Sequence, residues 1–120
     1  MKLNLKQIYE SVEVLKKISN KELPFVTSFK ILRILNVIAS PFNDFEKVRN
    51  NLIRRFGKAK EDKSDMLEVS PENIEAYYNE LSKLFVQEVE VEFELLKPSE
   101  LESISISPAE LFRIQFCITV

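Results

Sequence analysis

The sequence contains no histidine and no tryptophan, and it has a single glycine, Gly57, and a single cysteine, Cys117. The absence of histidine excludes Ser-His-Asp and Cys-His nucleophile arrangements, HExxH zinc proteases and the commonest general base. One glycine is too few for a phosphate-cradling glycine-rich loop or a GxGxxG fingerprint. One cysteine excludes an internal disulfide and a cysteine zinc cluster. We therefore expect a protein that is not an enzyme and that has no cofactor and no metal site.

Length and charge narrow the class of protein further. A chain of 120 residues predicts one domain over residues 1–120, and 45% apolar with 30% charged residues is typical of a globular protein. The net charge of −2 does not favour nucleic acid as a partner. No unbroken apolar run approaches the roughly 20 residues that span a bilayer, and the N-terminus lacks the apolar core of a signal peptide. We expect a cytoplasmic protein without a membrane partner.

The first amphipathic segment predicts a helix that begins after Asn4. Asn4 and Gln7 have the spacing of a capping box. Leu23-Pro24 disfavours continuation of this first helix past residue 23. The predicted apolar face recurs at intervals of three and four residues and consists of Leu5, Ile8, Tyr9, Val12, Leu15 and Ile18.

The second segment is the longest, and Pro41 lies in its middle. Its apolar residues keep one helical phase on both sides of the proline: Ile31, Leu35, Ile38, Phe42, Phe45, Leu52 and Phe56. Either one helix ends near Ala39 and another starts with Ser40 as N-cap, or one long helix is kinked at Pro41. The continuous phase favours a kinked helix or two nearly collinear helices. Gly57 is expected to cap the C-terminus of this segment in the left-handed conformation.

A polar loop over residues 58–65, a short strand over Met66–Val69 and a third helix are expected next. Ser70-Pro71 has the residue types of an N-cap followed by the first helical turn. The expected buried face of this helix consists of Ile74, Tyr77, Tyr78, Leu81, Leu84 and Phe85.

The hydrophobic period changes to two at residue 88. Residues 88–95 alternate glutamate with apolar residues, which predicts a strand with one buried face. Residues 103–106 alternate again and are expected to pair with that strand. Ser107 and Glu110 have capping-box spacing for a last helix. The predicted fold is therefore α+β, a mainly helical single domain with a long second helix and a small antiparallel sheet in the C-terminal half.

A group of cations is the strongest candidate for ligand binding. Such side chains can hold a phosphate or a nucleotide, and an exposed tyrosine can stack on a base. The alternative interpretation is a solvated helix end whose cations pair with nearby acids. The candidate anion- or nucleotide-binding residues are Arg33, Arg49, Arg54, Arg55, Lys58 and Tyr78.

Three further features have mainly structural interpretations. The alternating glutamates from Glu88 to Glu94 are typical of a solvated sheet face, with a divalent cation as the alternative. Cys117 lies among apolar residues and is expected to be buried and inert. The apolar C-terminal tail must be covered, either by the core of its own domain or by a second subunit. The candidate oligomer-interface residues are Phe112, Phe116, Ile118 and Val120.

Several segments together resemble a family of small uncharacterised proteins from phages and prophages, chiefly of Gram-positive bacteria. The resemblance covers nearly the whole chain. The segments that carry it are Leu23-Pro24 followed by residues 27–30, residues 45–53 running into Arg55-Phe56-Gly57, residues 88–93 after residues 80–84, and residues 106–111. The resemblance implies a phage origin and brings no catalytic residues.

Together with the missing catalytic chemistry, the resemblance predicts a non-enzymatic protein that binds a host factor in the bacterial cytoplasm, as in counter-defence. The first alternative is a protein that sequesters a nucleotide signal in a cationic pocket. The second alternative is a structural or assembly role in the virion. The expected partners are thus a host protein or a small nucleotide, together with a second copy of the chain.

Overall fold

A computed structural model describes residues 1–60, 63–69 and 71–119, and over residues 57–60 and 63–69 it describes the backbone alone. Within these residues the chain is mainly helical. The α-helices are α1 (Leu5–Ser19), α2 (Phe25–Phe56), α3 (Ile74–Phe85) and α4 (Pro108–Ile114). The strands are β1 (Lys2–Asn4), β2 (Gly57–Lys60), β3 (Lys63–Val69) and β4 (Glu88–Glu90). Short 3-10 helices are η1 (Pro71–Asn73), η2 (Pro98–Leu101) and η3 (Gln115–Cys117).

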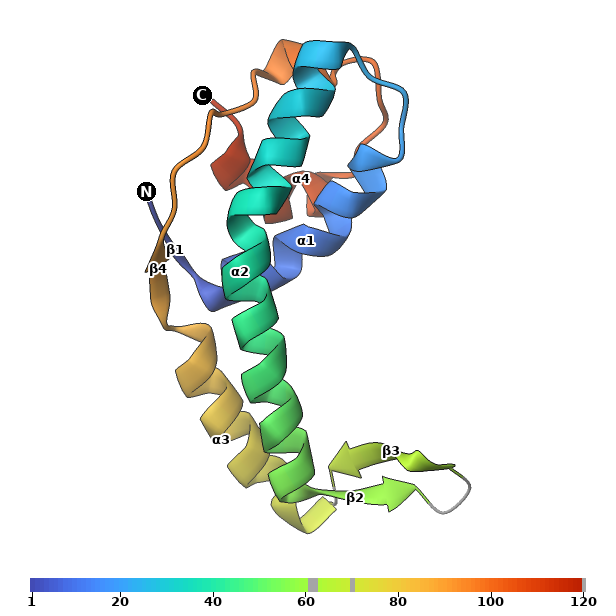
Figure 1. The fold of residues 1–120 in the computed structure, drawn as a ribbon, viewed down its shortest axis with the longest axis vertical. Coiled ribbons are helices and arrows are strands. Elements are labelled where there is room, and N and C mark those ends of the chain that lie inside the picture. The colour runs from blue at the N-terminus through green and yellow to red at the C-terminus, as the bar shows by residue number, and fades with distance from the viewer. Residues whose placement is uncertain (61–62, 70, 120) are drawn as a thin grey trace.

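The molecule is elongated along α2. Its principal extents are 48 × 31 × 24 Å. Its radius of gyration of 17.0 Å exceeds the roughly 14 Å of a compact chain of this length. In Figure 1 the N-terminal half of α2 packs against α1, which also contacts α4, whereas the C-terminal half of α2 is accompanied by α3 and the β2–β3 hairpin. Long stretches of α2 are therefore covered on one side only.

Helix α1 begins as the sequence predicts. The Gln7 backbone N–H donates to the Asn4 side-chain oxygen at 2.8 Å, and the Asn4 backbone N–H donates to the Gln7 side-chain oxygen at 2.9 Å. This reciprocal pair satisfies two donors that a helix N-terminus otherwise leaves free. The capping box is confirmed.

Helix α2 runs without interruption through Pro41. The interpretation as one long helix is correct, and the interpretation as two helices is wrong. A proline inside a helix cannot donate to the carbonyl four residues earlier, here that of Val37. The helix ends at Phe56 as expected, but Gly57 is the first residue of β2 rather than a left-handed cap.

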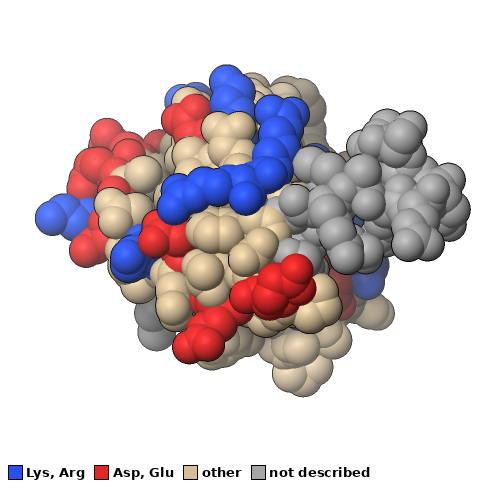
Figure 2. Space-filling view, turned by 90° about the horizontal axis from the view of Figure 1, so that it is seen from below, with Lys and Arg blue, Asp and Glu red and all other residues tan. Residues whose placement is uncertain are grey.

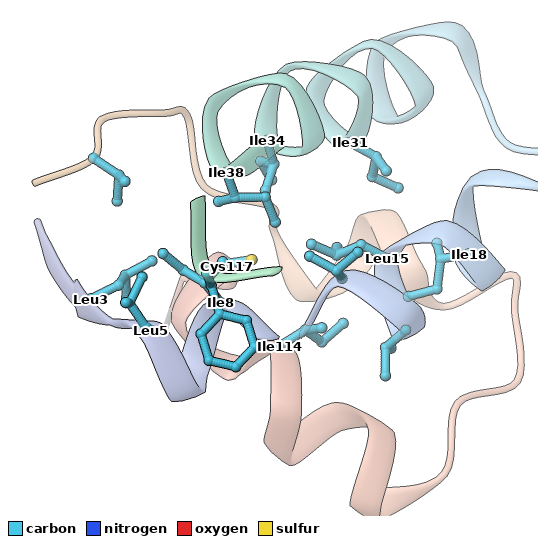
Figure 3. Packing of buried hydrophobic residues seen from close by; sticks show 14 of the residues in the cluster. Leu3, Leu5, Ile8, Leu15, Ile18, Ile31, Ile34, Ile38, Ile114 and Cys117 are labelled. Atoms are coloured by element: carbon cyan, nitrogen blue, oxygen red, sulfur yellow. The ribbon is translucent and has the colours of Figure 1, made fainter. Parts of the chain in front are cut away.

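The main core lies between α1, α2 and the C-terminal tail. Figure 3 shows Ile34 and Ile38 of α2 pointing toward Ile8 of α1, with Cys117 beside them. Each of these side chains is at most 1% exposed. A second cluster joins α1, α2 and α3 through the rings of Tyr9, Phe45 and Phe85, whose centroids lie 5.1 to 5.9 Å apart. These two clusters hold α2 against the rest of the chain.

The antiparallel sheet formed by β1 and β4 differs from the expected pairing. Lys2, Leu3 and Asn4 pair with Glu90, Val89 and Glu88 respectively. The predicted pairing of residues 88–95 with residues 103–106 is therefore wrong, and only residues 88–90 form a regular strand. The expected face is nevertheless correct, because the glutamates from Glu88 to Glu94 are exposed while Val91 is buried. Side-chain alternation predicted which face is covered but not which segment supplies the partner strand.

Gly57–Lys60 and Lys63–Val69 form a second two-stranded sheet, whereas a polar loop was expected over residues 58–65. Gly57–Lys60 pairs antiparallel with Lys63–Val69, with a register shift after Ala59. The strand predicted over Met66–Val69 is confirmed and is longer than expected. The predicted N-cap, Ser70, lies outside the described residues. Helix α3 begins at Ile74 after the short η1, so Pro71 does not open the α-helix itself.

The last helix, α4, has the expected capping box. The Glu110 backbone N–H donates to the Ser107 hydroxyl at 3.1 Å, and the Ser107 backbone N–H donates to Glu110 Oε1 at 3.1 Å. The tail then turns through η3 and runs beside Leu96 in a parallel bridge. The Leu96 N–H donates to the Cys117 carbonyl at 2.7 Å, and the Thr119 N–H donates to the Leu96 carbonyl at 2.8 Å. The tail is thus largely covered by its own chain.

Candidate functional site

The candidate cations are spread along α2. Twenty-one residues separate Arg33 from Arg54, and at a rise of about 1.5 Å per residue they lie about 30 Å apart along the helix. Arg33 is exposed and its guanidinium lies over the Phe29 ring, 5.7 Å from the centroid. Arg33 therefore cannot share one nucleotide-sized site with the arginines at the end of α2.

Arg49 is engaged in the junction between α1, α2 and α3. Its Nη2 lies 3.2 Å from Glu46 Oε1, and its Nη1 donates to the Tyr9 hydroxyl at 3.3 Å. Its guanidinium also lies over the Tyr9 and Phe45 rings, at 5.5 and 5.9 Å. Its Nε is buried and has no hydrogen-bond partner among the described residues. The Arg49 guanidinium thus interacts mainly with residues of its own chain and helps to hold these elements together.

The remaining candidates lie near the C-terminal end of α2. Arg54 and Arg55 are exposed and consecutive in α2. Because consecutive helical residues project about 100° apart, these two side chains leave the helix in different directions. Arg55 lies over the Phe56 ring at 4.8 Å, and Tyr78 is exposed on α3 with its ring edge-on to Tyr77. Figure 2 views this end and shows basic and acidic side chains on the same face. The Lys58 side chain lies outside the described residues.

The glutamates of the β4 region are solvent-facing. The terminal ammonium of Met1 lies 2.8 Å from Glu90, and this hydrogen bond and charge lower the pKa of the Glu90 carboxyl. Glu94 lies 3.6 Å from Lys30. Within residues 1–60, 63–69 and 71–119, no group of three or more histidine, cysteine, aspartate or glutamate residues is placed to hold a metal ion.

Cys117 is fully buried, as expected. Burial raises the pKa of its thiol to about 12. A thiol of that pKa is not ionised near neutral pH and is a poor nucleophile. The residue acts as part of the core between α1, α2 and the tail.

An open groove lies between α1, α2 and α4. It has a volume of about 460 Å³ and is lined by Tyr9, Glu10, Val12, Glu13, Lys16, Phe42 and Arg113. Its two carboxylates oppose its two cations, and the Lys16 ammonium lies over the Phe42 ring at 5.9 Å. This balanced charge gives the groove no preference for an anion such as a phosphate.

A mainly apolar groove lies at the C-terminal end of the chain. We call it the C-terminal groove. It has a volume of about 440 Å³ and is lined by Pro108, Leu111, Phe112, Gln115, Ile118 and Thr119. The structure thus brings together Phe112 and Ile118 of the four predicted tail residues. Phe116 is half-buried and its ring lies 6.4 Å from that of Phe93, and Val120 lies outside the described residues.

Helix α4 presents the C-terminal groove on a fixed support. Phe112 is 69% exposed, whereas Ile114, two residues later, is fully buried in the core. The Lys17 ammonium lies 2.9 Å from Glu110 and ties α4 to α1. Sequence reasoning missed Pro108, Leu111, Gln115 and Thr119 as lining residues. The adjacent apolar pair Leu111-Phe112 was the available signal, and both residues are exposed.

One described helix, α2, is long and apolar enough to cross a membrane by length and composition alone. Its most apolar 18-residue window has a mean hydropathy of 1.3, and 28% of that window is buried inside the protein. A core helix meets the same criterion, and α2 packs against α1 and α3. The finding therefore assigns no membrane location.

In comparisons with known proteins, no family model, no curated protein sequence and no solved structure matches this chain.

Proposed function

We propose that this chain is a non-enzymatic binding protein that contacts another protein through the C-terminal groove. The observation that carries the proposal is Phe112, an aromatic ring 69% exposed at the rim of an apolar groove. Aromatic residues that enter a partner's pocket dominate the energy of many protein interfaces. Because α4 is capped and tied to α1, little backbone conformational entropy is lost when this ring is bound.

The class of partner that we propose is a host protein. The resemblance to small phage proteins supports an origin in a phage or prophage, and the partner would then lie in the cytoplasm of the host bacterium. Binding alone is enough to block a host defence factor, so the proposal requires no catalytic residues. Counter-defence is the role that fits these expectations best.

Sequestration of a nucleotide is the less supported alternative. It needs several cations around one cavity, whereas Arg33 and Arg54 are about 30 Å apart along α2 and Arg49 is engaged with Glu46 and Tyr9. A role in virion assembly is compatible with the elongated shape and shares the same contact surface. Co-purification with virions separates assembly from host-factor binding.

Affinity capture with matched variants tests the proposal. The tagged protein is expressed in a Gram-positive bacterium, captured proteins are identified by mass spectrometry, and the affinity of a purified candidate is measured by calorimetry. Phe112→Lys is expected to weaken binding at least about tenfold, as hot-spot truncations do. Val48→Lys is the control, because Val48 is also exposed but lies on the C-terminal half of α2. Equal binding by both variants would overturn the proposal.

A further inference from the structure

The N-terminal half of α2 is apolar on two opposite sides, and the chain covers only one of them. Ile31, Ile34 and Ile38 are buried in the core. Phe25, Phe29 and Leu32 are exposed and share one stripe, because their spacings are four and three residues. The helical repeat of about 3.6 residues places this stripe roughly opposite the buried isoleucines. We call Phe25, Phe29 and Leu32 the α2 apolar face.

A helix that is apolar all round is normally covered all round. Phe25 is 80% exposed, and its ring stacks on that of Phe29 with centroids 6.1 Å apart. These stacked rings form a protruding ridge. The exposure of two adjacent phenylalanines and a leucine on one helix marks a surface that another molecule covers.

A groove lies directly beside this ridge. It has a volume of about 290 Å³ and is lined by Ser19, Leu23, Ser28, Ile31, Leu32 and Leu35. That volume exceeds the roughly 150 Å³ of an apolar cavity that holds a benzene ring. Leu32 belongs to both the ridge and the groove, so a knob and a hole lie side by side on one face. Such a face is complementary to a copy of itself related by a two-fold axis.

The charges at the two ends of the α2 apolar face support the same geometry. Glu22 precedes the face, Arg33 follows it, and both are exposed. A two-fold axis through the middle of the face makes two copies run antiparallel, which brings each Glu22 toward the partner subunit's Arg33. A parallel arrangement would instead place like charges together, which is unfavourable.

The accessible surface of the whole chain exceeds that of a compact monomer of the same mass. Its accessible area is 8190 Å² for a mass of 14.0 kDa, against about 6,700 Å² for a compact monomer of that mass. The excess of about 1,500 Å² follows from the elongated shape of the chain.

We propose that this chain forms a two-fold symmetric homodimer in which the α2 apolar faces of two copies pack antiparallel. The Phe25 ring of each copy enters the groove beside the partner subunit's Leu32. This dimer does not use the C-terminal groove, so it stands or fails independently of the function proposed above. It also places the self-association surface on α2 rather than on the tail.

Sedimentation equilibrium of the purified chain over a wide concentration range tests the dimer. The expected mass is twice 14.0 kDa at high concentration. Phe25→Lys/Phe29→Lys is expected to weaken dimerisation at least about a hundredfold, because it buries charges in the contact. Val48→Lys, an exposed substitution on the other half of α2, should dimerise like the wild type, and circular dichroism checks that both variants fold. A wild-type chain that stays monomeric, or a double variant that dimerises equally well, overturns the proposal.

A charge exchange tests the antiparallel arrangement. Arg33→Glu alone is expected to weaken the dimer about three- to tenfold, since it opposes two acids at each end of a symmetric contact. Adding Glu22→Arg should restore the wild-type affinity. If the double variant Arg33→Glu/Glu22→Arg does not restore the wild-type dimer affinity, the antiparallel contact is contradicted. A vesicle assay tests lipid as the alternative occupant of this face. If the wild type stays monomeric and floats with phosphatidylcholine vesicles, while Phe25→Lys/Phe29→Lys does not float, the face binds lipid and the proposal is overturned.

Discussion

The ammonium of Lys30 on α2 lies 2.9 Å from a carboxylate oxygen of Glu100 in η2, and the two side chains are only 9% and 15% exposed. The Lys97 backbone N–H donates to Glu100 at 2.9 Å, and the Thr27 hydroxyl donates to its other oxygen at 3.2 Å. Three donors from two segments therefore converge on one carboxylate. This cluster joins η2 to the N-terminal half of α2, far apart in the sequence.

Loss of Lys30 should be more damaging than loss of the charge on Glu100. The hydrogen bond from Lys30 is the main cause that lowers the pKa of the Glu100 carboxyl. Lys30→Met leaves that carboxylate shielded from water without its counter-charge, which is costly. We expect the midpoint of thermal unfolding to fall by more than about 4 °C. Glu100→Gln keeps one acceptor oxygen for either Lys97 or Thr27 and leaves Glu94 3.6 Å from the Lys30 ammonium, so its unfolding midpoint should fall less.

Glu94→Gln is the control for this cluster, because Glu94 lies farther from Lys30, at 3.6 Å, and its side chain is exposed. Its unfolding midpoint should stay close to that of the wild type, as for most surface ion pairs. A Lys30→Met variant as stable as Glu94→Gln would show that the Lys30–Glu100 pair does not hold η2 in place.

The acid stability of the protein should depend on Glu110. The hydrogen bond from Lys17, followed by that from the Ser107 backbone N–H, lowers the pKa of the Glu110 carboxyl from 4.5 to about 2. Because this pKa is lower in the folded state, the stabilisation is complete above about pH 4.5 and is lost as the pH falls toward 2. Denaturant unfolding at several pH values should show a shallower loss for Glu110→Gln than for the wild type.

The matched control for the acid dependence is Glu102→Gln, an exposed substitution on the loop before α4. It should follow the wild-type curve between pH 5 and 2, the interval set by the pKa of Glu110. If Glu110→Gln also follows that curve, the Lys17–Glu110 pair does not contribute to folding.

Phe45 should be among the most sensitive positions in the chain. Its ring is 1% exposed and contacts those of Tyr9 and Phe85 at the junction of α1, α2 and α3. Phe45→Ala leaves a cavity and is expected to lower the free energy of unfolding by about 3–5 kcal/mol. Val48→Ala, an exposed change on the same helix, should alter it by less than about 0.5 kcal/mol. Urea titration of both variants measures the difference.

Pro41→Ala should stabilise the protein. Pro41 lies in the interior of a continuous helix, where it removes a backbone hydrogen bond and alanine is intrinsically favoured by up to about 3 kcal/mol. We expect a gain of about 1–3 kcal/mol in the free energy of unfolding. A loss of stability on this substitution would mean that the core requires the local geometry that proline imposes on α2.

Local signals in the sequence predicted the helices well. The capping boxes at Asn4 and Ser107 are formed as expected, and the continuous apolar phase across Pro41 correctly favoured one long segment. These features depend on residues within a few positions of one another. The strand pairing was wrong because it depends on distant segments: Lys2–Asn4 is too short to show a period, yet it pairs with Glu88–Glu90.

The candidate site was harder to predict for the same reason. Residue type identified the arginines of α2, but their separation follows from the uninterrupted helix, which places Arg33 about 30 Å from Arg54. Composition singled out the apolar tail as a candidate contact surface. Phe112 is exposed on α4, whereas the direction of the Phe116 ring depends on the turn at η3, which no local pattern indicates.

Photo-crosslinking in living cells tests the central claim, that the C-terminal groove binds another protein. A benzophenone amino acid replaces Phe112 in one variant and Val48 in a matched one, and the crosslinked products are identified by mass spectrometry. We predict that the probe at Phe112 captures one bacterial protein, that the probe at Val48 does not, and that unlabelled wild-type chain competes for the capture. Absence of any product specific to Phe112, with both variants folded, would contradict the account.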